Sequence, residues 1–275
     1  MSEEKGYRIL EDIAYYGSGE PFWKLDLALP AEAHNGKRPA VLIVHGGGFE
    51  MCTKREEFES RMLRFLAGHG YAAASVEYRL STVAPFPSPF VDVRRALQFL
   101  RGHAGEYGID PGRIGAVGHS AGATLAALLA LIPNSEWLDV QTPYSQYSGT
   151  VPAVVGLSGM FAFDAWMDDP DPELLSRIGA IIPGRMETRV LRMQDASPMT
   201  YIGKHEAAFL LVHGDRDDTC PLTQAEAFLA RLRQKNYRDA ALKVYPGVKH
   251  DTFMLPGLPD VILEFFDQRL KKKSE

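Results

Sequence analysis

A serine flanked by glycines stands between an apolar run and a segment of helix length. The motif Gly-His-Ser-Ala-Gly occupies positions 118–122, after the apolar residues 114–117 and at the start of the apolar segment 121–131. Small residues on both sides suit a sharp strand-to-helix turn that holds a serine hydroxyl above a sheet, beside helix N–H groups that favour negative charge. The pattern predicts Ser120 as a nucleophile; the alternative is a serine that only caps a helix after a glycine turn.

Three consecutive glycines follow another apolar run, after His45. Glycines can adopt positive φ, and no side chain covers their N–H groups. In acyl transfer, such N–H groups can stabilise the oxyanion that forms from the carbonyl oxygen. We expect the N–H groups of Gly47, Gly48 and Ala121 to form this oxyanion hole, and His45 to anchor the loop by hydrogen bonds. A phosphate-binding loop is the alternative, but the loop has neither glycine pattern typical of one.

A serine hydroxyl becomes a good nucleophile when a histidine takes its proton and a carboxylate orients that histidine. The chain has eight histidines. The order serine, acid, histidine that is typical of this architecture leaves His213 and His250 as candidates. His213 precedes every acid of its own loop, whereas His250 follows the last predicted strand, so we predict His250 as the general base. The ring of His119 should point away from Ser120.

The acid should come from the loop between residues 213 and 221, which contains three aspartates. Asp215 could serve only to stabilise the turn. The spacing alone leaves Asp217 and Asp218 both open as the residue that orients His250.

The elements that would position these residues alternate between apolar runs and helix-length amphipathic segments. This alternation predicts an α/β fold with an eight-stranded, mostly parallel sheet and helices on both faces. The first two strands alternate more clearly and should form an antiparallel ribbon. The predicted strands are residues 8–16, 22–29, 40–45, 71–77, 114–118, 153–157, 207–213 and 241–245. The predicted helices are residues 54–69, 90–107, 121–131, 222–235 and 258–270.

A long segment between the sixth and seventh predicted strands interrupts this alternation. It covers residues 158–202 and is too long for a plain connection. A small lid over a ligand site is favoured over extra core packing, because long insertions at the ligand-binding end of a sheet usually serve function. We therefore expect a single domain over residues 1–275 with this lid-like insertion.

Charge and cysteine content narrow the class of protein. The formal net charge is −5 and basic residues are scattered, which argues against nucleic acid or an anionic membrane surface as a partner. The N-terminal residues do not resemble a signal peptide, and no apolar stretch has the length of a membrane span. With two cysteines and no disulfide framework, we expect a cytoplasmic protein. Monomer and homodimer both stay open as its oligomeric state.

These residues together resemble the α/β-hydrolase-fold esterases of the hormone-sensitive-lipase-like and acetylxylan/feruloyl-esterase-like branches. The resemblance covers most of the chain and rests on residues 45–48, 77–80, 92–131, 197–198 and 213–217. In that family the acid is the aspartate three residues after His-Gly and four before Pro, which is Asp217 here, with Pro221 in place. The chain departs from the family in Cys220, where valine is usual, and in Ala123, where many members have a second glycine.

The resemblance implies a serine carboxylic ester hydrolase that works through an acyl-enzyme and needs no cofactor and no metal. It favours small-molecule esters with short acyl groups, of acetyl or aryl type, including acetyl or feruloyl esters from plant cell walls. The alternatives are an arylformamidase, amidase or peptidase with the same triad, and a non-catalytic ligand receptor. The family's strand order puts Cys52 and Cys220 about 14 Å apart, against about 7 Å for a disulfide, so two free thiols are expected.

Overall fold

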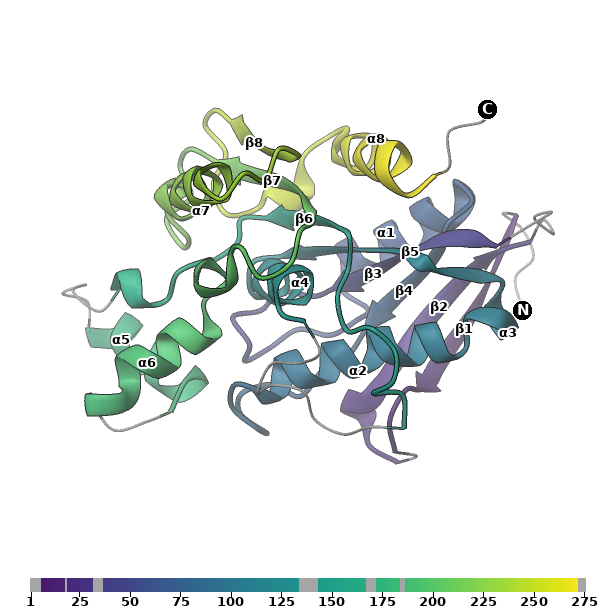
Figure 1. Ribbon diagram of the computed structural model, residues 1–275, viewed down its shortest axis with the longest axis horizontal. Helices are drawn as coiled ribbons and strands as arrows, with labels where there is room; N and C mark the ends of the chain where they lie inside the picture. Colours follow the sequence, from purple (N-terminus) through teal and green to yellow (C-terminus); the bar gives the residue numbers. More distant parts are fainter. Residues whose placement is uncertain are drawn as a thin grey trace.

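The computed structural model describes residues 6–17, 19–31, 37–133, 143–166, 172–183 and 186–271. These residues form an eight-stranded sheet with the strand order β1-β2-β4-β3-β5-β6-β7-β8 (Figure 1). The strands are β1 Tyr7–Ala14, β2 Lys24–Pro30, β3 Arg38–Val44, β4 Ala72–Val76, β5 Ile109–His119, β6 Ala153–Leu157, β7 Ala208–Gly214 and β8 Ala240–Tyr245. All eight predicted strands are present, and only β5 begins well before its predicted start.

The pairing of the strands brings the predicted site residues to one edge of the sheet. β2 pairs antiparallel with β1 and β4, and every other neighbouring pair is parallel. The strands between β4 and β7 are buried on both faces, which explains their continuous apolar sequences. Because β3, β5, β7 and β8 run in the same direction, the loops after them meet beyond their carboxyl ends.

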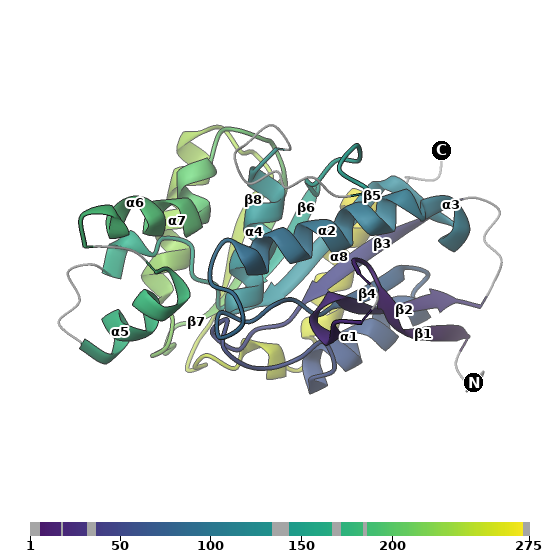
Figure 2. The same cartoon turned by 90° about the horizontal axis from the view of Figure 1, so that it is seen from below.

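Helices cover both faces of the sheet (Figures 1 and 2). α1 (Glu57–Gly68) and α8 (Leu258–Leu270) pack on one face. The other face is covered by α2 (Ser88–Gly102), α4 (Ala121–Leu131) and α7 (Leu222–Gln234). Every residue of α4 is buried, as its apolar sequence predicts.

Two helix boundaries differ from the predicted ones. The segment 90–107 is two helices, because Gly102, a poor helix former, ends α2 before α3 (Ala104–Tyr107) begins. α1 starts at Glu57 rather than at Lys54. The N–H groups of Lys54 and Arg55 bond instead to the side chains of Glu77, at 3.1 Å, and Thr53, at 3.2 Å.

The insertion between β6 and β7 contains α5 (Pro172–Ile181) and α6 (Met186–Ala196). These helices form a lobe at one end of the molecule, on the left in Figures 1 and 2. Short 3₁₀ helices occur at Pro21–Trp23, Asp164–Trp166, Pro198–Tyr201 and Thr252–Met254. No helix in the described part of the chain combines the length and the apolar character that crossing a membrane requires.

Candidate active site

Ser120 lies at a sharp turn between β5 and α4, with φ 53° and ψ −118°. Residues other than glycine rarely adopt such a conformation, and it persists only where the surroundings impose it. A Cβ on Gly118 would lie 2.3 Å from the carbonyl carbon of Gly122, and a Cβ on Gly122 would lie 2.1 Å from the oxygen of Val44. Both flanking glycines are therefore required by close backbone contacts.

The glycine loop after β3 lies directly over this turn. A Cβ on Gly46 would lie 2.9 Å from the backbone oxygen of His119. Gly47 and Gly48 have φ values of +92° and +59°, which favour glycine. The loop glycines, Ala121 and Ser120 all line one cavity.

Side chains after β3 and β4 stabilise the glycine loop by hydrogen bonds and ring stacking. Nε2 of His45 lies 3.1 Å from a carboxylate oxygen of Glu77, and its ring stacks on Tyr78 with the ring centres 4.1 Å apart. The Tyr78 hydroxyl donates to the backbone oxygen of His45 at 3.0 Å. His45 thus anchors the loop by hydrogen bonds, as expected.

The three aspartates of the loop after β7 have different partners. Nδ1 of His250 donates to Asp217, at 2.9 Å from Oδ2 and 3.0 Å from Oδ1. Asp215 accepts a hydrogen bond from the backbone N–H of Gly247 at 2.6 Å, which ties two loops together. Asp218 is exposed and pairs with Lys249. Of the three, Asp217 is the one in contact with His250.

The structure gives Asp217 a second histidine partner that sequence reasoning missed. Nε2 of the buried His213 lies 3.2 Å from Oδ2 of Asp217 and donates to the backbone oxygen of Cys220 at 2.8 Å. The backbone N–H groups of Thr219 and Cys220 also donate to Asp217. Burial by itself would raise the pKa of Asp217, but the hydrogen bonds to His213, His250 and Cys220 outweigh it and hold the pKa far below its usual range.

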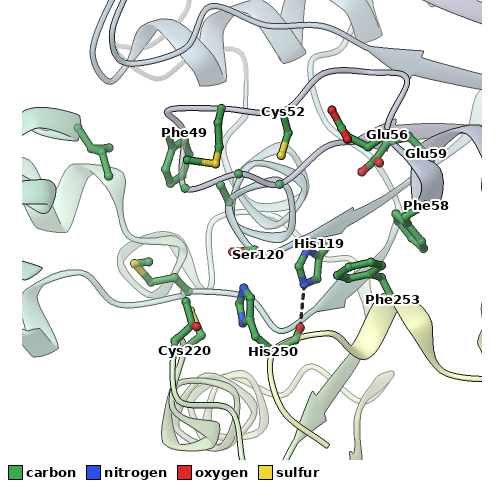
Figure 3. Close-up of a pocket in the computed structure, with 18 of the residues that line it drawn as sticks. Phe49, Cys52, Glu56, Phe58, Glu59, His119, Ser120, Cys220, His250 and Phe253 are labelled. Atoms are coloured by element: carbon green, nitrogen blue, oxygen red, sulfur yellow. Dashed lines mark hydrogen bonds between the residues drawn. The ribbon is translucent and has the colours of Figure 1, made fainter.

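His119 contacts the loop of His250 rather than the serine. Its Nε2 donates to the backbone oxygen of His250 at 3.0 Å, and its ring packs against the rings of His250 and Phe253 (Figure 3). Burial lowers the pKa of His119 to about 4, which keeps the ring neutral near neutral pH. His119 therefore helps to fix the loop that carries His250.

The cavity beside Ser120 and His250 has a volume of about 520 Å³. One side is apolar, with Phe49, Met160, Ile178 and Ile181, and the last two belong to α5 in the insertion. The opposite side, at the start of α1, combines acidic and aromatic side chains, with Phe58 and Phe253 beside the glutamates. Three glutamates line it: Glu56, Glu57 and Glu59. Figure 3 shows Ser120 and His250 between Phe49 and this acidic side.

Cys52 and Cys220 also line the cavity, and both are free thiols. Burial raises the pKa of each, so both remain protonated near neutral pH. Over the described residues, no group of three or more His, Cys, Asp or Glu side chains is arranged to hold a metal ion.

The sheet and its serine turn define the protein as one of α/β-hydrolase fold, and comparison with solved structures agrees. A truncated carbohydrate esterase from gut microbiota superposes with a TM-score of 0.85 at 22% identity, covering 98% of this chain and 99% of that one. A thermophilic esterase from Thermogutta terrifontis gives 0.76 at 21% identity, covering 99% and 96%. More particularly, the chain belongs to the BD-FAE family, whose model matches residues 25–232.

Relatives of known name are esterases. The probable carboxylic ester hydrolase LipM of Mycobacterium tuberculosis is 30% identical over 216 residues, which are 78% of this chain and 49% of that protein. Esterase LipC of the same organism is 27% identical over 248 residues, 88% of this chain and 60% of that protein. The chain thus spans between half and three fifths of the length of these relatives.

Proposed function

We propose that the protein is a serine carboxylic ester hydrolase that acts on small esters through an acyl-enzyme. The observation that carries the proposal is the hydrogen-bonded pair of Asp217 and His250 at the cavity that Ser120 lines. Family membership and the esterase names of the relatives support the same reaction.

In the proposed mechanism, Ser120 attacks the ester carbonyl carbon while His250 accepts the hydroxyl proton. Asp217 orients the imidazole and stabilises its positive charge. The N–H groups of Gly47, Gly48 and Ala121 hold the oxyanion. His250 then protonates the leaving alkoxide, and afterwards takes a proton from the water that hydrolyses the acyl-enzyme.

We propose that residues 158–202 act as a lid within a single domain, and that the apolar side of the cavity takes the acyl group. Ile178 and Ile181 of α5 line that side, and the backbone oxygen of Ile181 accepts a hydrogen bond from Phe86 N–H at 3.0 Å. Because these isoleucines limit the apolar side, we infer short acyl groups, including acetyl and aryl types. Ile181→Ala should shift the preferred acyl chain of p-nitrophenyl esters to greater length, and an unchanged preference would argue against this role.

The decisive experiment compares Ser120→Ala with the wild type on p-nitrophenyl acetate. Loss of the nucleophile should reduce kcat by about 10³-fold or more. Ser60→Ala, the same substitution outside the cavity on α1, is the matched control and should behave as wild type. Intact-protein mass spectrometry after a fluorophosphonate should show one adduct in the wild type and none in Ser120→Ala. Near wild-type hydrolysis by Ser120→Ala would refute the proposal.

A further inference from the structure

Glu59, in the first turn of α1, is a buried carboxyl group that the proposed mechanism does not use. Only 3% of its surface is exposed, and it lines the cavity that Ser120 lines. Figure 3 shows the carboxyl groups of Glu56 and Glu59 close together at one side of the pocket. Within the described part of the chain, Glu59 has no hydrogen bond or ion pair with another residue, and its own backbone N–H is its donor.

The surroundings of Glu59 add no compensating positive charge. The charged or titratable groups near it are Glu56 just before α1, Cys52 and His45 after β3, and Glu77 and Tyr78 after β4. His45 already lies against Glu77. No lysine or arginine of the described chain lines the cavity. Burial, opposed in part by the backbone N–H and His45, raises the pKa of Glu59 to about 7.

A buried carboxyl group whose donor is its own backbone N–H still costs folding stability, so a ligand group that donates a second hydrogen bond would stabilise it. A hydroxyl group can donate to a carboxylate without bringing charge into the cavity, and such charge-assisted hydrogen bonds are strong. A carboxylate on the substrate would be repelled by the glutamates on this side. An alkyl group would leave Glu59 desolvated and unpaired.

We propose that Glu59 is a specificity-determining residue that accepts a hydrogen bond from a hydroxyl group on the alcohol part of the ester. The inference rests on the proposed esterase function and extends it to the leaving group. The apolar side of the cavity takes the acyl group, and the acidic side selects hydroxylated alcohols over apolar and anionic ones.

The test compares monoacetates of straight-chain diols of two to six carbons with the acetates of their monomethyl ethers. The two esters of a pair have the same acyl group and alcohols of similar acidity. They differ in that one has a free hydroxyl group and the other has a methyl ether in its place. At the chain length that reaches Glu59, the wild type at pH 8 should prefer the hydroxyl ester by about tenfold in kcat/KM. Glu59→Gln should reduce this preference, and Glu59→Met should abolish it. Glu226→Gln, an exposed glutamate on α7, should leave it unchanged.

Hydrolysis of the methyl-ether esters shows whether a variant is folded and active. Their kcat/KM should equal or exceed that of wild type in both Glu59 variants, because these esters donate no hydrogen bond and the variants remove the carboxylate that they leave unpaired. The inference is overturned if no chain length shows a donor preference, if Glu59→Met retains it, or if both ester types slow equally. Hydrolysis that does not depend on Ser120 would instead overturn the proposed function itself.

Discussion

Two buried carboxyl groups belong to the site, one lining the cavity and one behind His250, and the protein surrounds them in opposite ways. Asp217 lies in the loop after β7 and contacts two histidines and two backbone N–H groups. Glu59 lies at the start of α1 and has no hydrogen-bond partner among the other described residues. Burial pushes both pKa values upward, but that of Asp217 ends far below its usual range and that of Glu59 near 7.

The difference separates two uses of a carboxyl group. A group that orients a histidine has to be ionised and fixed, so the chain itself supplies its donors. A carboxyl group that binds a ligand can lack a hydrogen-bond donor, at a cost in folding stability, until the ligand supplies that donor. The following predictions test this contrast.

The largest effect should come from Asp217→Asn. The amide can hold His250 in the wrong tautomer and cannot stabilise its positive charge, so kcat on p-nitrophenyl acetate should fall by about 10³–10⁴-fold. Asp218→Asn changes an exposed residue of the same loop, which pairs with Lys249, and should remain within about twofold of wild type. Equal losses in the two variants would contradict the assignment of Asp217.

Glu59→Gln should stabilise the folded protein at high pH. Because the pKa of Glu59 is raised from 4.5 to about 7, the folded state keeps a proton that the unfolded state releases, and wild-type stability falls as pH rises through this window. The neutral amide avoids this loss. Denaturant unfolding should therefore show an advantage for Glu59→Gln that grows from pH 4.5 to pH 8 by about 3 kcal/mol. If the difference in unfolding free energy between Glu59→Gln and wild type did not change with pH, burial would not raise the pKa of Glu59.

His213→Ala should test how far Asp217 depends on its second histidine. Loss of one donor loosens the carboxylate and should lower kcat/KM on p-nitrophenyl acetate by about tenfold, the factor that about 1.4 kcal/mol represents. His205→Ala, which removes a histidine outside the cavity, provides the comparison. Wild-type activity in His213→Ala would mean that His250 and the backbone suffice to hold Asp217.

The smallest effect concerns pH and the donor preference. An ionised Glu59 accepts a stronger hydrogen bond than a protonated one, so the hydroxyl-to-ether ratio in kcat/KM should rise by about threefold between pH 6 and pH 8. Effects of pH on steps that the two esters share cancel in the ratio. If the hydroxyl-to-ether ratio rose with pH as much in Glu59→Gln as in wild type, another group would cause the effect.

The parts of the site that depend on local backbone geometry were predictable from the sequence. Gly118 and Gly122 are required by contacts within the turn and with the neighbouring strand, so the motif around Ser120 specifies its own conformation. The strands were predictable for a similar reason, because burial on both faces produces long apolar runs. The choice of Asp217 over Asp218 needed the family spacing, since both are polar loop residues.

The parts that depend on contacts between distant segments were not predictable. Glu59 reads in the sequence as one of several glutamates at a helix start, where acidic residues are ordinary. Its burial comes from the packing of α1 against the sheet. The hydrogen bonds of His213 to the acid loop and of His119 to the backbone of His250 depend on loop geometry that no local pattern encodes.

The strand that leads to His250 lies at the edge of the sheet. β8 is hydrogen-bonded only to β7, and its side chains are exposed or half-buried, unlike those of the central strands. Edge segments of this kind open at a lower free energy than the whole molecule. The loop that carries His250 is also held by Asp217, by His119 and by the hydrogen bond between Asp215 and Gly247. We therefore expect these hydrogen bonds, rather than β8 itself, to keep His250 beside Ser120 when the edge of the sheet opens.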